Sequence, residues 1–177
     1  MILSRRNALL ACAGVFASSS VTAQSLAAPN VILISPLLVT SGQPSAQALA
    51  SLGQSGFQAV IYLAPSSVPD AIKNEPELLS AQGIEFVHIP IPFGSPDESH
   101  FLTVSAALER LANKKVLVHC QVNMRASSMV FLHRVIRGNE DPAVAYEAVA
   151  RVWSPSGAWR KLLAAQLGKH RVNFEPY

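Results

Sequence analysis

Residues 114–128 read KKVLVHCQVNMRASS, and the arrangement of the remaining chain can be worked out from this stretch. Three apolar residues, Val116 to Val118, follow two lysines and predict a short buried strand. Apolar residues then recur at helical spacing from Ala126 to Val135. The six residues from Cys120 to Arg125 therefore form a turn between a strand and a helix, with a single thiol at its start.

This turn has the features of an anion-binding site that carries a nucleophile. Backbone N–H groups at a helix start have no partner within the helix, and the helix dipole adds roughly half a positive charge there. The loop is therefore expected to hold a tetrahedral anion, and its positive environment favours the thiolate of Cys120 as the attacking species. Arg125 adds a planar fork of donors that can bind two oxygens of one anion.

The turn resembles the signature of the cysteine-dependent protein tyrosine and dual-specificity phosphatases, most closely that of small bacterial relatives with a beta-lactamase-hydrolase-like phosphatase domain. His119 and Cys120, followed by Arg125 and Ser127, match the family's order of His-Cys, short loop, arginine and hydroxyl. The resemblance implies that Cys120 and Arg125 are catalytic. It also implies a set of phosphate-binding residues, namely Gln121, Val122, Asn123, Met124, Arg125 and Ser127.

The loop departs from the family pattern in its length. Four residues separate Cys120 from Arg125, whereas the usual phosphatase loop has five and rhodanese-type sulfurtransferases typically have four. A shorter loop makes a smaller cradle for an anion. Asn123 stands near the place of a frequent family glycine, and asparagine can adopt the left-handed backbone angles found there.

Two neighbours of the nucleophile are given supporting roles. His119 lies on the strand, so its side chain should point to the opposite face of the sheet, where we expect it to hydrogen-bond the loop rather than act as a base. Ser127 is expected to donate a hydrogen bond to the Cys120 sulfur, and its alternative role is a local cap in the first helical turn.

A phosphatase of this kind also needs an acid to protonate the leaving oxygen, because an alkoxide is a poor leaving group at neutral pH. The family carries an aspartate for this purpose on the loop that corresponds here to residues 91–100. The position directly after the strand holds Phe93 or Gly94, and Asp97 follows with Glu98 beside it. The resemblance makes Asp97 the expected acid, with Glu98 or no acid as open alternatives. Both residues also suit the start of the next helix.

Residues 1–28 have the pattern of an export signal. Arg5 and Arg6 give a positively charged start, and an apolar run, 8–17, precedes small residues typical of a cleavage site. A membrane-spanning helix needs about 18 apolar residues, so no stable membrane insertion is expected once the signal is removed. The general secretory and twin-arginine routes both stay open. We expect the protein in a bacterial periplasm, with residues 29–177 as one phosphatase-like catalytic domain.

Removal of the signal changes what the composition indicates. Without Arg5 and Arg6 the formal net charge of the chain falls from +3 to +1. The remaining basic residues are scattered, so no nucleic-acid partner is expected. Cys12 leaves with the signal, and Cys120 is then the one thiol left. No metal or organic cofactor is expected, because the histidines outside the turn lack metal-ligand spacing; they are His88, His100, His133 and His170.

Short apolar runs alternate with helical patterns over the remaining chain, which predicts an α/β fold. We expect a central, mostly parallel sheet of four to five strands flanked by helices, with the catalytic loop between a central strand and a helix. The runs 31–34 and 37–40, split by Ser35-Pro36, predict a hairpin or bent strand at a sheet edge. A helix should begin after Ser45 and turn Gly53 inward. The phosphatase relatives have the same order of elements, so the resemblance covers roughly residues 31–167.

The function implied by these residues is the hydrolysis of phosphate monoesters through a thiophosphate intermediate on Cys120. The partner would be a phosphorylated protein or small molecule. Two alternatives stay open: a rhodanese-type sulfurtransferase that carries sulfur as a Cys120 persulfide, and an inactive phosphatase-like module that binds an anion without turnover.

Overall fold

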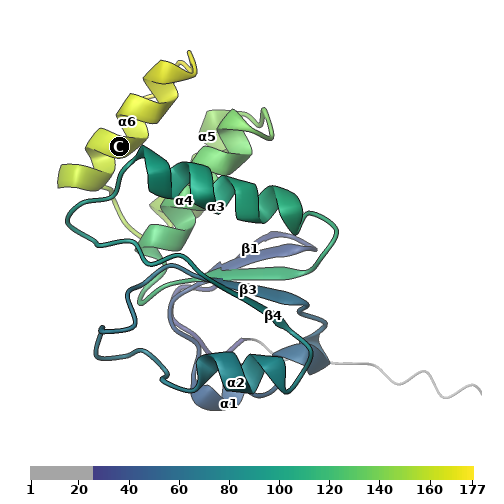
Figure 1. The fold of residues 1–177 in the computed structure, drawn as a ribbon. Helices are drawn as coiled ribbons and strands as arrows, with labels where there is room; N and C mark the ends of the chain where they lie inside the picture. Colours follow the sequence, from purple (N-terminus) through teal and green to yellow (C-terminus); the bar gives the residue numbers. More distant parts are fainter. Residues whose placement is uncertain (1–25) are drawn as a thin grey trace, which may run out of the picture.

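A five-stranded sheet runs through the middle of the protein in a computed structural model that describes residues 26–177 (Figure 1). Its spatial order is β1-β2-β5-β3-β4, with β1 antiparallel to β2 and every other neighbouring pair parallel. The predicted α/β class with a mostly parallel sheet is confirmed. The strands are β1 (Ile32–Ser35), β2 (Leu38–Ser41), β3 (Ala59–Tyr62), β4 (Glu85–His88) and β5 (Val116–His119).

The edge hairpin predicted from Ser35-Pro36 is present, because β1 and β2 pair as antiparallel neighbours with a register shift at Ser35. Proline has no N–H to donate to a ladder, so the chain turns here instead of continuing as one strand. β5, the strand that leads into Cys120, lies at the centre of the sheet between β2 and β3. Cys120, the residue after β5, therefore follows a strand that is paired on both sides.

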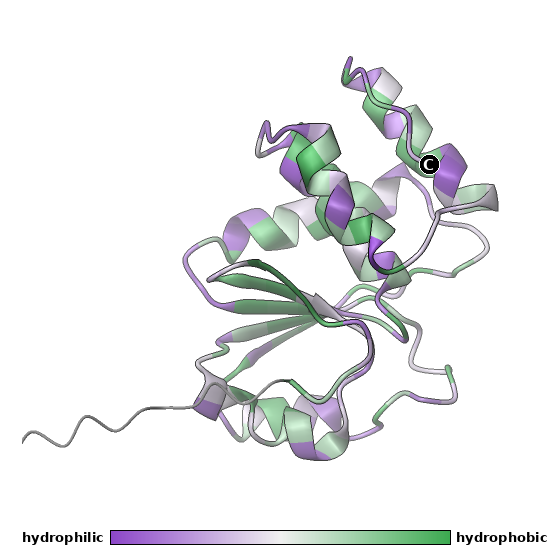
Figure 2. Ribbon diagram, turned by 180° about the vertical axis from the view of Figure 1, so that it is seen from behind, coloured by the Kyte–Doolittle hydropathy of each residue, from purple (hydrophilic) through white to green (hydrophobic). Residues whose placement is uncertain are grey.

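Helices cover both faces of the sheet in unequal layers (Figure 1). Two short helices lie on one face, and four lie on the other, where α4 follows directly from the catalytic loop. Seen from behind, the strands form the most hydrophobic band of the molecule and lie between these two layers (Figure 2). The helices are α1 (Ala46–Leu49), α2 (Glu75–Ser80), α3 (Glu98–Arg110), α4 (Met124–Ile136), α5 (Pro142–Ala150) and α6 (Gly157–Lys169).

Strand alternation produces two hydrophobic cores, one on each face. Successive side chains of a strand point to opposite faces. Val116 and Val118 accordingly join the larger core under the four-helix layer, whereas Leu117 joins the smaller core against α1 and α2. By the same alternation His119 belongs to the face of α1 and α2, while Cys120 lies in the larger core.

The helix predicted after Ser45 begins there but does not run as one element. The Ser45 hydroxyl accepts a hydrogen bond from the Ala48 N–H, as expected of an N-cap. The helix then breaks into α1 and a 3₁₀ turn, η1 (Leu52–Ser55), and Gly53 is exposed, so its predicted inward placement is wrong. The Gln82 side chain accepts from the Gly53 N–H and donates to the Leu49 carbonyl, taking up backbone groups near the break.

The predicted export signal falls almost entirely on residues 1–25, outside the described part of the chain. Its last residues, 26–28, already contribute to the fold, since the Ala27 carbonyl accepts a hydrogen bond from the Ser45 N–H at 3.1 Å. Within residues 26–177 no helix combines the length and apolarity needed to cross a bilayer.

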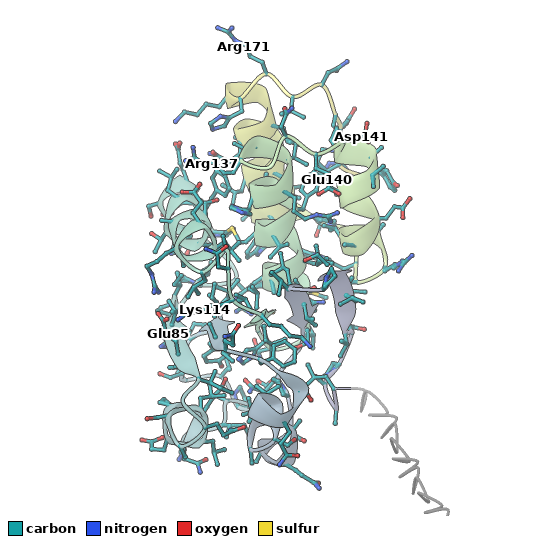
Figure 3. All side chains as sticks on the ribbon, turned by 90° about the vertical axis from the view of Figure 1, so that its right-hand side faces the viewer. Glu85, Lys114, Arg137, Glu140, Asp141 and Arg171 are labelled. Carbon is teal, nitrogen blue, oxygen red and sulfur yellow. The ribbon has the colours of Figure 1, made fainter. Side chains whose placement is uncertain are left out.

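The carboxyl ends of the parallel strands meet at one edge of the sheet. His119 ends β5 in register with Ser41 of β2 and Tyr62 of β3, and Tyr62 is in register with His88 of β4. The loops after these four strands therefore leave the sheet together. Ligands of parallel α/β sheets bind in this position. The opposite end is held by ion pairs instead, among them Glu85 with Lys114 at 2.7 Å, and these two side chains lie together in Figure 3.

Candidate active site

Cys120 is the first residue after β5, and its backbone N–H donates to the Ser41 carbonyl at 3.3 Å. The residue is fully buried and carries a free thiol. Burial alone is equally typical of an inert core cysteine. Whether this thiol is reactive therefore depends on the groups around it.

The loop after Cys120 offers backbone donors that the fold does not use. The N–H groups of Gln121, Val122, Met124 and Arg125 have no acceptor of good geometry within residues 26–177. Met124 begins α4, so two of these groups belong to the first turn of a 13-residue helix. The predicted arrangement of free amides at a helix start is present, and it provides an electropositive surface next to the thiol.

Asn123 shapes the loop in the way expected of it. Its φ of 72° lies in the left-handed region, as the comparison with glycine anticipated. Its side chain donates to the Thr40 hydroxyl at 3.0 Å and to the Asn30 carbonyl at 2.6 Å. Asn30 returns a bond to the Val122 carbonyl at 2.9 Å. The loop is thus fixed to the segment that precedes β1.

The turn after β2 supports the loop from its outer side. Gln43 N–H donates to the Gln121 carbonyl at 2.9 Å, and Gly42 forms an isolated bridge with Val122. A Cβ on Gly42 would lie 2.6 Å from the Gln121 carbonyl oxygen and 3.0 Å from the Val122 Cα. Only glycine permits this approach of two backbones.

Arg125 is almost fully buried and is held beside the loop. Its Nε donates to the Ile91 carbonyl at 2.9 Å, and one terminal nitrogen lies 3.4 Å from Gln121 Oε1. The guanidinium also stacks over the Phe93 ring, 5.1 Å from its centroid. These contacts fix one side of the fork, while the other terminal nitrogen, Nη2, bonds to no group in residues 26–177.

The remaining loop residues differ in what they present. Val122 is 40% exposed, and Gln121 and Met124 are half-buried. Ser127 is buried, but its hydroxyl donates to the Met124 carbonyl at 3.3 Å. This bond goes to the carbonyl three residues earlier and is not an N-cap, and a bond from Ser127 to the Cys120 sulfur stays a prediction.

Asp97 is the N-cap of α3 and makes its contacts there. Its carboxylate accepts from the Ser99 hydroxyl at 2.7 Å and the His100 N–H at 3.1 Å, while its own N–H donates to the His100 ring. The Ser99 and His100 hydrogen bonds hold the pKa of Asp97 below its ordinary value. Glu98 pairs with Lys169 of α6. These contacts are those of a helix cap, and the catalytic role of Asp97 stays a prediction.

A buried polar layer beneath the loop was missed by sequence reasoning. His119 Nε2 lies 2.6 Å from Glu75 Oε1, and Gln43 Nε2 donates to Glu75 Oε2 at 3.0 Å. Glu75 and His119 are 2% and 0% exposed. The expected bond from His119 to the catalytic loop is not formed; instead its ring bonds the first residue of α2. Glu75 is one of two acidic residues in the first turn of the short helix α2.

Tyr62 completes this layer. Its ring stacks between His119 and His88, with centroid distances of 4.7 and 5.0 Å. Its hydroxyl is buried and has no hydrogen-bond partner in the described residues. Burial, reinforced by the negative charges of Glu75 and Asp70, raises the pKa of Tyr62 to about 12, so the hydroxyl stays a donor at neutral pH. No sequence pattern marked Tyr62 beyond its place in a buried strand.

Asp70 also reaches the loop, from the long connection between β3 and α2. Its exposed carboxylate accepts a hydrogen bond from Gln121 Nε2 at 2.8 Å. Within residues 26–177 no group of three or more His, Cys, Asp or Glu side chains has the arrangement of a metal site.

Comparison with known proteins connects this arrangement to phosphatases. A family model described as a DSP-PTPase phosphatase fused to NAD+ kinase matches residues 33–161. A solved DUF442 protein from Shewanella putrefaciens CN-32, itself assigned as a phosphatase by inference, is 30% identical with a TM-score of 0.73, and the match covers 81% of this chain and 94% of that one. A comparison with curated proteins finds no match.

More distant structures share the fold alone. The core catalytic domain of the PP-IP phosphatase SIW14 from S. cerevisiae, solved with citrate, is 15% identical with a TM-score of 0.61, covering 86% of this chain and 100% of that one. P. aeruginosa TpbA, solved with pTyr, is 19% identical with a TM-score of 0.56, covering 77% and 90%.

Proposed function

We propose, from the premise that the chain belongs to the DSP-PTPase family of cysteine-dependent phosphatases, that it hydrolyses phosphate monoesters with Cys120 as the nucleophile. The observation that carries the proposal is the set of unpaired loop N–H groups and the buried Arg125 fork around the first residue after β5. A tetrahedral oxyanion such as phosphate suits these donors better than a planar or uncharged ligand does.

In the first step the Cys120 thiolate attacks phosphorus. An S–P bond forms as the bond between phosphorus and the ester oxygen breaks, and the leaving oxygen takes a proton from an acid or from water. The loop amides and the free side of the Arg125 fork neutralise the negative charge on the non-bridging oxygens. They do so without reorganising, because Asn123, Gln43 and Ile91 already fix the loop and the guanidinium.

In the second step a water molecule attacks the thiophosphate. Its oxygen bonds to phosphorus, the S–P bond breaks, and inorganic phosphate leaves while the thiolate of Cys120 is restored. The same donors stabilise the charge again, since phosphate geometry is similar in both steps. The four-residue spacer between Cys120 and Arg125 makes the loop small, so we expect the loop to bind one phosphate group at a time.

The substrate we propose is a phosphorylated protein or small molecule. TpbA was solved with pTyr and SIW14 is named as a PP-IP phosphatase, and these two proteins of the same fold support a phosphorylated substrate here. We also propose that residues 1–28 direct export to a bacterial periplasm. Mass spectrometry of the protein recovered from the periplasmic fraction tests this, and an intact residue 1 there would contradict it.

Two parallel assays test the proposed reaction against its alternatives. The purified protein is expected to release phosphate from p-nitrophenyl phosphate and to form no thiocyanate from thiosulfate and cyanide. Thiocyanate without phosphate would instead identify a sulfurtransferase, the chemistry that a four-residue loop also permits. Neither product, with phosphate still bound in a titration, would identify an inactive anion-binding module.

Gly42→Ala is expected to lower kcat/KM for p-nitrophenyl phosphate by about 10- to 100-fold, since displacing catalytic groups by about 1 Å costs rates of that order. The new Cβ would collide with backbone atoms of Gln121 and Val122, and no side-chain rotation can relieve that contact. The catalytic loop must therefore shift. Steady-state kinetics on the two proteins measure the effect.

Gly168→Ala in α6 is the matched control, because a Cβ there has no neighbour within 4 Å. It makes the same chemical change far from any backbone contact and should leave kcat/KM unchanged. Equal activity of Gly42→Ala and Gly168→Ala would show that the turn after β2 does not set the loop geometry.

A further inference from the structure

We propose that Asp70 is the general acid that protonates the leaving oxygen, an inference that rests on the proposed phosphatase function. The position expected for this acid from the family resemblance, in the loop after β4, is occupied by an apolar or a small residue, Phe93 or Gly94. An acid is still needed for esters whose leaving group is a poor one. Asp70 reaches the mouth of the loop from the connection between β3 and α2 instead.

The first support is a chain of hydrogen bonds across the mouth of the loop. Gln121, the residue next to the nucleophile, donates from Nε2 to the Asp70 carboxylate at 2.8 Å. Its Oε1 faces a terminal nitrogen of Arg125 at 3.4 Å. One amide side chain thus joins the carboxylate to the guanidinium that would hold the phosphate. Asp70 is exposed, so its second oxygen is open to a substrate entering from solvent.

The second support comes from the charges that act on Tyr62. Asp70, Arg125 and Cys120 all influence the pKa of the Tyr62 hydroxyl, together with Glu75. Charges act strongly only over short distances, so each of these groups lies near the Tyr62 hydroxyl, at the carboxyl edge of the sheet. Asp70 therefore shares the space around Tyr62 with the nucleophile and the anion-binding arginine.

Asp97, the acid expected from the family resemblance, is less suited to donate a proton. Its carboxylate is used by the Ser99 hydroxyl and the His100 N–H as the cap of α3. These bonds tie the Asp97 carboxylate to the first turn of α3, whereas Asp70 has only the bond from Gln121. Donating a proton from Asp97 would also require the cap to break.

The proton balance of the step is simple. As the thiolate of Cys120 forms its bond to phosphorus, the carboxyl of Asp70 gives its proton to the departing ester oxygen and becomes a carboxylate. In the second step that carboxylate accepts a proton from the attacking water. The other ionisable groups that act on the neighbouring Tyr62 hydroxyl are Glu75, Arg125 and Cys120.

The test compares kcat/KM for two substrates with different leaving groups, p-nitrophenyl phosphate and phenyl phosphate, across pH. Asp70→Asn is expected to lower kcat/KM for phenyl phosphate by roughly 100-fold or more, and to have a much smaller effect with the better leaving group. The decline of wild-type kcat/KM at high pH should disappear in the variant, because no acid is left to lose its proton. Asp70→Glu should restore part of the loss.

Glu77→Gln is the matched control, since Glu77 is an exposed acidic residue of α2 whose side chain makes no bond in residues 26–177. It should leave both substrates unaffected. The inference is overturned if Asp70→Asn slows both substrates equally, the mark of a positioning role, or if Asp97→Asn alone produces the leaving-group dependence. A wild-type protein that releases no phosphate from either substrate would overturn the proposed function itself, and Asp70 would have no reaction to serve.

Discussion

Cys120→Ser is expected to reduce phosphate release from p-nitrophenyl phosphate by about 1000-fold or more, because the enzyme would lose its nucleophile. A serine hydroxyl attacks only when a neighbouring base removes its proton. The nearest histidine in sequence, His119, has its Nε2 bonded to Glu75 at 2.6 Å on the other face of the sheet. His119 is therefore not placed to activate a serine. Steady-state rates with saturating substrate measure the change.

Phosphate binding is the internal control for this substitution. The loop amides and Arg125 are unchanged in Cys120→Ser, so inorganic phosphate should still bind in a titration with an affinity similar to that of the wild type. A melting curve checks the fold, because a buried hydroxyl without a partner costs about 1–3 kcal/mol. Phosphate release at the wild-type rate from a folded variant would remove Cys120 from the mechanism.

The catalytic loop could be predicted because its determinants are contiguous in sequence. Apolar residues, a thiol, four loop residues, an arginine and a helical pattern follow each other within residues 114–135, so local rules suffice to place them. The left-handed Asn123 and the edge hairpin at Ser35-Pro36 were predictable for the same reason. Each depends on one residue type and one backbone preference.

The polar layer under the loop could not be predicted, because it depends on packing between distant segments. Glu75 and His119 are 44 positions apart, and Gln43 and Glu75 are 32 apart. An acidic residue at a helix start is usually a solvated residue of the first turn. Its burial here follows from how α2 packs beneath the sheet, which no local pattern encodes.

Asp70 was overlooked for a related reason. The sequence shows only a proline-rich connection after β3, and the path of that connection decides which side chain reaches Gln121. Family resemblance directed attention to the loop after β4 and to Asp97, which has a structural use as the cap of α3. The motif was enough to single out Cys120, whereas the acid that we propose lies outside the motif, and its position depends on loop geometry.

Glu75→Leu is expected to destabilise the protein by about 3–5 kcal/mol, because it leaves buried polar groups of His119 and Gln43 without a partner, each at a cost of about 1–3 kcal/mol. His119 Nδ1 already lacks a partner in the described residues, so the substitution would leave both ring nitrogens unbonded in the core. Gln43 Nε2 would lose its acceptor as well. For a protein of this size the melting temperature should fall by roughly 6–20 °C, measured by calorimetry.

Glu75→Gln separates the loss of hydrogen bonds from the loss of volume. The new amide oxygen can still accept from His119, and its NH₂ can donate to Gln43 Oε1, which has no partner at present, if the Gln43 amide rotates by 180°. The cost should then stay near 1 kcal/mol, the net worth of a typical hydrogen bond. Equal losses in Glu75→Leu and Glu75→Gln would show that the negative charge itself, rather than the hydrogen-bonded layer, holds the end of β5 and with it Cys120 in place.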